Sequence, residues 1–218
     1  MRGRLLALAL LAAAALAPAG ARGAAPAGGE PAPTPFARAA PGATLALRPS
    51  YAPGAGSLAR GLPLSDALYS QVPLQLDALW RAGDLAFGAY AAFGLGQVGG
   101  DACGPGASCS AWDLRAGAQA LLSATPFGDP GLVLWAGLGL GWEWAAQRRE
   151  RLGSRTAWSW NGAEARVQGG LEWPLGARLG LGPFLQIAAG RYARESLDTG
   201  DASASAALDA KAFHAWIE

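Results

Sequence analysis

The single histidine of this chain, His214, is the first residue to consider for chemistry. Paired with Glu218 or Glu143, it would act as the base of an enzyme that trims or transfers lipid acyl chains, provided that a serine nucleophile lay beside it. No serine-containing motif flanks His214, and its position alternates onto the ionic face of its segment rather than the apolar one. The sequence therefore predicts no catalytic residue, and an acyl-chain enzyme is kept as an alternative.

The only two cysteines, Cys103 and Cys109, lie in the stretch DACGPGASC. A metal site would need further ligands nearby, and the sequence offers none. The five-residue spacer of glycine, proline and small residues suits a tight loop, so the sequence predicts a disulfide formed in an oxidising compartment. Glycine runs such as GLGLG are not followed by a helix, which excludes a phosphate-binding loop. No metal and no cofactor are expected.

The N-terminus carries the features of an export signal. Arg2 and Arg4 precede the apolar run 5–17, and small residues before Ala24 allow cleavage after Gly23. At 13 residues, the run is too short to cross a bilayer of about 30 Å. A net charge of +1 gives no reason to expect nucleic acid as a partner. The predicted organisation is a signal peptide at 1–23, a leader rich in Pro, Ala and Gly at 24–42, and one domain at 43–218.

The elements that position these residues are predicted from the stretch GLVLWAGLGLGWEWA, at 131–145. Its even positions are Leu, Ala and Trp, whereas its odd positions are mostly small and include Glu143. A period of two indicates a strand, and each of its central glycines would cost a helix roughly 1 kcal/mol. The eight segments that are predicted as strands are 43–52, 70–80, 85–97, 111–123, 131–145, 157–173, 177–193 and 211–218.

The connections between these segments alternate in length. Those after the second, fourth and sixth segments are short, whereas those after the first, third, fifth and seventh are longer and hold most of the charged and turn-forming residues outside the strands. Short turns at one end and long loops at the other are typical of an up-and-down antiparallel barrel. The predicted fold class is all-β, an eight-stranded antiparallel up-and-down barrel that spans a membrane.

The less apolar face of the strands is dominated by Gly, Ala, Gln and charges of both signs, and Lys211 is the only lysine. A water-exposed exterior would carry more Lys and Glu, so this face is predicted to line a filled lumen, where charges must pair. A soluble lipocalin-like carrier, with the faces reversed, is the other alternative. The predicted lumen network is Asp77, Asp113, Arg115, Glu143, Glu164, Arg166, Glu172 and His214, joined by Arg48, Gln75, Gln119, Gln168, Gln186 and Glu218.

Aromatic residues gather at the ends of the predicted strands, which is typical of the two interfacial girdles of a membrane barrel. Tyr192 and Trp216 are expected in the band on the long-loop side, whereas Trp135 has inward parity. The predicted girdle is Trp80 and Trp173 on the short-turn side, and Trp112, Trp142, Trp144, Trp158 and Trp160 on the long-loop side.

Together, the export signal, the Gly- and Trp-rich alternating strands and the alternating loop lengths resemble the small eight-stranded outer-membrane β-barrel proteins of Gram-negative bacteria, the class of OmpA-type and OmpX-type barrels. The resemblance covers 43–218 and is one of pattern. It implies insertion by the barrel-assembly machinery, which reads a terminal aromatic residue; this chain stops at Glu218 in a short last strand, which suggests truncation or an unusual closure.

The resemblance implies a monomer surrounded by outer-membrane lipid and lipopolysaccharide. The expected function is that of a porin-like barrel with a filled lumen, either a structural component of the envelope or a scaffold that presents loops for binding. The basic segment QRRER, at 147–151, is expected in a long outer loop, where it either contacts lipopolysaccharide phosphates or is simply solvated.

Overall fold

The computed structural model describes residues 41–59, 62–99, 103–126, 131–175, 179–208 and 213–218. The predicted signal peptide and almost all of the predicted leader lie outside the described residues. Within the described ranges, no helix is long and apolar enough to cross a membrane.

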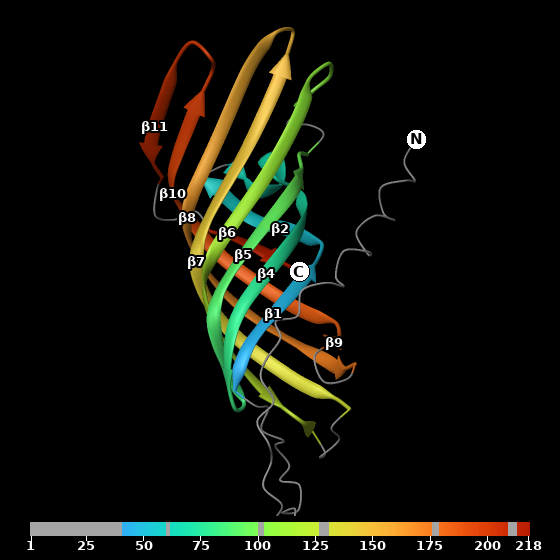
Figure 1. The fold of residues 1–218 in the computed structure, drawn as a ribbon. Coiled ribbons are helices and arrows are strands. Elements are labelled where there is room, and N and C mark those ends of the chain that lie inside the picture. Colours follow the sequence, from blue (N-terminus) through green and yellow to red (C-terminus); the bar gives the residue numbers. More distant parts are fainter. Residues whose placement is uncertain (1–40, 60–61, 100–102, 127–130, 176–178, 209–212) are drawn as a thin grey trace, which may run out of the picture.

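Eight antiparallel strands form a hydrogen-bonded ring, as predicted (Figure 1). The first strand of the ring is interrupted at 50–51 and consists of two parts, of which β1 pairs with β4 while β2 pairs with both β12 and β4, so the ring closes. In ring order the strands are β1 (Gly42–Pro49) with β2 (Ala52–Ala59), β4 (Ser70–Ala82), β5 (Leu85–Gln97), β6 (Ser108–Ala124), β7 (Val133–Arg151), β8 (Ser154–Pro174), β10 (Phe184–Asp198) and β12 (His214–Ile217).

The last strand, β12, is short but still completes the ring. It pairs with β10 on one side and with β2 on the other. Reciprocal backbone hydrogen bonds between Gln186 and Glu218, of 2.8 and 2.9 Å, extend the pairing with β10 by one residue. Every neighbouring pair in the ring is antiparallel, which confirms the predicted fold class at the level of strand number, direction and closure.

The two faces of the strands point as the alternation predicts. On β7, Leu138 and Leu140 are 66% and 70% exposed, whereas the side chain of Glu143 is fully buried. On β10, Leu185 is exposed while its neighbour Gln186 is buried. Apolar side chains therefore cover the outside of the barrel and polar side chains fill its interior, the opposite of the arrangement in a soluble carrier of apolar ligands.

The strands extend further at one end than predicted. β7 and β8 stay paired as far as Arg151 and Ser154, and only Leu152 and Gly153 turn the chain. The expected long outer loop around QRRER is therefore wrong: the segment lies within a β-hairpin. β10 likewise continues to Asp198 and pairs with β11 (Ser203–Ala207). Both hairpins rise above the ring at the same end in Figure 1.

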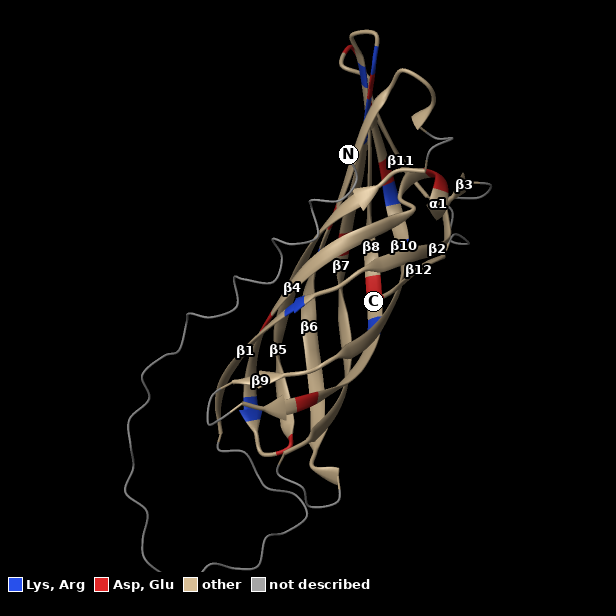
Figure 2. Ribbon diagram, turned by 90° about the vertical axis from the view of Figure 1, so that its right-hand side faces the viewer, with Lys and Arg blue, Asp and Glu red and all other residues tan. Residues whose placement is uncertain are grey.

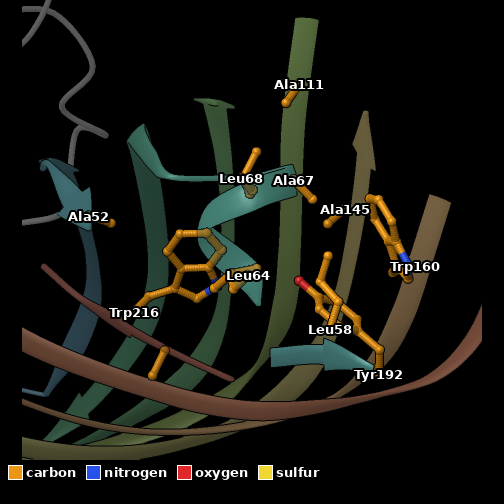
Figure 3. Packing of buried hydrophobic residues seen from close by; sticks show 11 residues of the cluster. Ala52, Leu58, Leu64, Ala67, Leu68, Ala111, Ala145, Trp160, Tyr192 and Trp216 are labelled. Carbon is orange, nitrogen blue, oxygen red and sulfur yellow. The ribbon is translucent and has the colours of Figure 1, made fainter. Parts of the chain in front are cut away.

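A second departure from the expected loops lies between β2 and β4. Here the chain forms β3 (Leu62–Pro63) and the single-turn helix α1 (Leu64–Ala67), and Leu58 and Leu68 flank this segment. The side chains of Leu58, Leu64 and Leu68 are buried. They enter the lumen-side cluster drawn in Figure 3, which includes Trp216 and Tyr192 from the barrel wall. We call the described residues 58–59 and 62–68 together the cap. One further short strand, β9 (Gly180–Leu181), pairs with β8 at the short-turn end.

Candidate functional site

The polar lumen begins near the short-turn end with a cluster around Asp77 of β4. Arg48 of β1 forms an ion pair with Asp77, with 2.6 Å between Nε and Oδ2. Gln75 donates to the other carboxylate oxygen at 2.7 Å and accepts from Arg166 of β8 at 2.8 Å. Arg166 also donates to Gln119 of β6 at 2.6 Å. Side chains from four strands are therefore joined across the barrel, with Asp77 paired to Arg48 and Arg166 bonded to two amide oxygens.

A second cluster of charges in the lumen is centred on Arg115 of β6. Its Nε lies 2.9 Å from Oδ2 of Asp113, and one terminal nitrogen lies 3.8 Å from Oε2 of Glu164. It also forms an ion pair with the side chain of Glu218. Tyr90 of β5 donates to Glu164 at 3.2 Å. This one guanidinium is thus the cation that lies close to the carboxylates of Asp113, Glu164 and Glu218, and buried charges of this kind are tolerated only when they are paired.

Glu143 of β7 is the centre of the third cluster, toward the outer end. Its carboxylate accepts from the hydroxyl of Tyr192 at 2.6 Å and from the indole nitrogen of Trp216 at 2.9 Å. Nε2 of His214 lies 2.6 Å from the other oxygen. The rings of His214 and Tyr192 stack with centroids 4.1 Å apart. The carboxylate is held by aromatic donors from β10 and β12, and no serine hydroxyl shares a hydrogen bond with His214 among the described residues.

The glycines of GLGLG leave space for these side chains. A Cβ on Gly139 would lie 2.8 Å from Nε of Arg166, and a Cβ on Gly141 would overlap the hydroxyl of Tyr90. Arg166 in turn lies over the Tyr90 ring, 3.0 Å from its centroid. The small residues on the inward face of β7 are therefore required by the packing of Arg166, from the neighbouring strand β8, and of Tyr90, from β5.

Seven of the eight residues predicted for the lumen network are buried: Asp77, Asp113, Arg115, Glu143, Glu164, Arg166 and His214. The exception is Glu172, which is only partly buried at the short-turn end and has no ion-pair partner among the described residues. Glu172 faces Val133 at the start of β7, where the lumen opens. The position has the correct inward parity but lies too near the rim to join the network.

The prediction of the aromatic girdle is partly wrong. Trp80, Trp112, Trp142, Trp144 and Trp173 are exposed on the outside of the barrel, between 38% and 52%. Trp160, however, is 3% exposed and lies in the lumen-side cluster, and Trp158 packs partly buried against the same cluster. Tyr192 and Trp216 also point inward, as Figure 3 shows. Trp158 and Trp160 share the parity of Glu164 on β8, so the alternation itself contained the signal that strand-end position obscured.

The cap and these inward aromatics close the outer end of the lumen. The buried members of the cluster are Ala52, Leu58, Leu64, Ala67, Leu68, Ala111, Ala145, Trp160, Ala188, Tyr192 and Trp216. Trp216 belongs to both layers, since its ring packs in this cluster while its indole nitrogen donates to Glu143. The polar network is therefore covered at the outer end of the lumen by this apolar cluster, which we call the apolar stopper.

The disulfide between Cys103 and Cys109 is formed, with the two Cα atoms 5.9 Å apart. It closes a loop at the start of β6, where Cys109 lies opposite Arg149 of β7. A Cβ placed on Gly104 would lie 3.3 Å from a terminal nitrogen of Arg149, so this guanidinium rests against the disulfide loop. Within the described ranges, no group of three or more His, Cys, Asp or Glu side chains could hold a metal ion.

The site thus defines a closed, eight-stranded antiparallel barrel with an ion-paired interior and an apolar exterior. A search of solved structures finds a match to the crystal structure of Neisserial surface protein A (NspA), with 14% sequence identity and a TM-score of 0.42; the alignment covers 81% of this chain and 98% of that one. No protein-family model matches the chain, and no curated protein matches it significantly. The assignment of the fold rests on the hydrogen-bonded ring of the chain itself.

Proposed function

We propose that the chain is an outer-membrane β-barrel that sits closed in the membrane and presents its β7–β8 and β10–β11 hairpins at the cell surface, as a structural component of the envelope or as a scaffold for binding. The observation that carries this proposal is the apolar outer wall. Its exposed members include Leu45, Leu74, Leu76, Phe93, Leu95, Leu138, Leu140, Val167, Leu185 and Ile187.

The outer wall suits lipid rather than water. Monomeric soluble proteins rarely expose contiguous apolar patches of more than a few hundred Å². Six strands of the ring run for 13 to 21 residues, and roughly 9–11 residues cross the hydrocarbon of a bilayer. A closed ring also satisfies the backbone donors and acceptors without water, which the bilayer interior requires. The exposed tryptophans at the two ends of the wall suit the headgroup layers.

The interior argues against transport and against the two alternatives. The ion pairs of Arg115 and the cap occupy the lumen, so we expect no ion conduction in planar bilayers. An enzyme that acts on acyl chains would need His214 near the lipid, whereas His214 is buried beside Glu143. A lipocalin-like carrier would need an apolar interior. Conductance steps, or a change in lipid A mass spectra that depends on the protein, would contradict this part of the proposal.

The partners of such a barrel are outer-membrane lipid and lipopolysaccharide around it, and the barrel-assembly machinery during insertion. We further propose that the barrel is a monomer, that it needs no cofactor and that it does not bind nucleic acid. Cross-linking in intact membranes tests the monomer, and depletion of the assembly machinery tests the insertion route, because the protein should then accumulate unfolded in the periplasm.

The decisive experiment is fractionation combined with gel mobility before and after heating. We expect the protein in the outer-membrane fraction, resistant to carbonate extraction, and migrating faster when it is not boiled because the closed barrel stays folded in detergent. Recovery in the soluble periplasmic fraction would contradict the proposal.

A further inference from the structure

The β7–β8 hairpin carries an excess of positive charge that takes no part in the ion pairs of the lumen. Arg148, Arg149, Arg151 and Arg155 lie within eight residues, against the single carboxylate of Glu150. Glu150 forms an ion pair with Arg148, and by register it also lies opposite Arg155. By register and alternation these three residues share the outward face of the hairpin, so the one carboxylate of the hairpin is already paired there. Blue and red stretches of ribbon mark the charged residues of the hairpin in Figure 2.

The opposite face of the hairpin has no such compensation. Arg149 lies opposite Thr156, and Arg151 lies opposite Ser154. Residues that alternate along a strand share a face, so both guanidiniums point to the same side, the side continuous with the lumen. Neither arginine forms an ion pair with any residue that the structure describes. Two fork-shaped donors without an anion form a site suited to oxyanions, which accept two parallel hydrogen bonds from each guanidinium.

This face is also hollowed. A pocket of about 410 Å³ is lined by Arg149, Arg151, Leu152, Ser154, Thr156 and Trp158, with no carboxylate among them. The two hydroxyls offer further donors, and the Trp158 indole forms an apolar floor at the end nearer the barrel. An aromatic face beside polar donors suits a sugar ring, whose C–H face packs on the indole while its substituents reach the donors.

Two features hold the pocket in shape. Trp158 packs against the apolar cluster at the outer end of the lumen, so the floor of the pocket is fixed to the barrel. Arg149 rests against the loop closed by the disulfide, beside Gly104. A guanidinium held in place loses less side-chain entropy when it binds an anion.

We propose that this pocket binds a phosphorylated saccharide, with the phosphate between Arg149 and Arg151 and the sugar ring on Trp158. The hairpin reaches beyond the aromatic side chain of Trp142 by nine residues to Arg151, about 30 Å along the strand. It therefore rises from the headgroup layer into the layer of saccharides, where phosphosugars of lipopolysaccharide and free phosphosugars both occur. The inference deepens the proposed function, on which it rests only for the hairpin being accessible at the surface.

The test measures binding to the refolded full barrel in detergent by calorimetry, with a bisphosphorylated glucosamine disaccharide, its dephosphorylated form and inorganic phosphate as probes. We expect the bisphosphorylated disaccharide to bind, and the double variant R149A/R151A to weaken its binding about 100-fold. The matched control R148A/R155A removes the same charge from the other face of the same hairpin and should change the affinity by less than about threefold. Equal losses in both double variants would show diffuse attraction and overturn the proposal.

Two further variants separate the parts of the site. Trp158→Phe should weaken binding of the disaccharide and leave that of inorganic phosphate unchanged, whereas R149K/R151K should retain only part of the affinity because lysine lacks the fork. Equal binding of the dephosphorylated disaccharide would overturn the role of the arginines. Each variant is first checked for heat-modifiable mobility, so a failure of folding or of the barrel assignment is distinguished from a failure of the pocket.

The source of the ligand is resolved by reconstitution. Barrels in bilayers with and without rough lipopolysaccharide are compared for hydrogen exchange of the hairpin amides. Slower exchange with lipopolysaccharide, lost in R149A/R151A, assigns the pocket to lipopolysaccharide of the same membrane. Unchanged exchange together with binding of the free disaccharide assigns it to soluble phosphosugars. Absence of both effects would refute the site.

Discussion

At the scale of single residues, Arg115 decides whether the lumen charges are tolerated. Its guanidinium faces Asp113, Glu164 and Glu218, and its own side chain is almost completely buried. Arg115→Met would keep the volume but leave these carboxylates without their cation, so we expect a loss of about 3–5 kcal/mol in the free energy of unfolding. Guanidinium titration of the refolded barrel measures this loss. Arg155→Met on the exposed hairpin is the control, expected within about 0.5 kcal/mol, and equal effects would contradict the network.

The residues of the network could be predicted because the period of two assigns a face to every strand position. Asp113 and Arg115, for example, fall on one parity in a strand whose other parity is apolar. Trp160 lies near a strand end, as girdle residues do, but its inward parity places its side chain in the lumen. Which inward residues meet, such as Tyr90 with Glu164, could not be predicted, because that depends on strand register and tilt around the closed ring.

At the scale of elements, the cap contributes the apolar stopper of the lumen. Leu64 is fully buried in the cluster with Trp216 and Leu58. Leu64→Ala should remove these contacts and lower the free energy of unfolding by about 2–5 kcal/mol. The same titration measures it, with Leu152→Ala at the hairpin apex as the control, since Leu152 is 94% exposed. If Leu64→Ala and Leu152→Ala have the same free energy of unfolding, the cap does not stabilise the barrel.

The turn of the β7–β8 hairpin holds Leu152 in an unfavourable backbone conformation. Leu152 has a φ of 47° and Gly153 a φ of 82°, the pattern of a two-residue turn that favours Asn-Gly. A non-glycine residue in this left-handed region costs roughly 1–2 kcal/mol, and asparagine tolerates it better. Leu152→Asn should therefore slow hydrogen exchange of the amides at the hairpin end by roughly 5- to 30-fold. Faster exchange would mean that Leu152 contributes contacts that outweigh the strain.

The elements beyond the ring could not be predicted, for a physical reason. In the stretch RRERLGSRTA, at 148–157, no side chain is fully buried on either face, so the alternation that marks a half-buried strand disappears and the segment resembles a loop. The helix α1 has four residues, too few to show a period of 3.6. The other strands of the ring could be predicted because each separates an apolar outside from a polar inside over most of its length, whereas β2, which pairs with β12 to close the ring, lies beyond the predicted segment 43–52.

At the scale of the whole molecule, polar clusters and an apolar cluster together fill the lumen. The Arg115 ion pairs and the Glu143 cluster adjoin, since Arg115 lies opposite Glu143 in the β6–β7 register, and the cap packs with Trp216, which donates to Glu143. The interior and the outer wall of the barrel are thus stabilised in different ways. Ionic groups are stabilised by one another inside, whereas the apolar wall gains nothing from water and needs another apolar medium outside.

The environment of the outer wall is therefore testable at a single position. Leu138 lies on β7 between Trp142 and the short-turn end, pointing outward. In a bilayer, an arginine near the midplane of a barrel costs roughly 2–4 kcal/mol, whereas on a wet surface the same change costs almost nothing. We expect Leu138→Arg to lose this amount in phospholipid vesicles, measured by guanidinium unfolding. Leu152→Arg, at the apex and outside the hydrocarbon, should be neutral. Equal stability of both variants would show that water, not lipid, surrounds the wall.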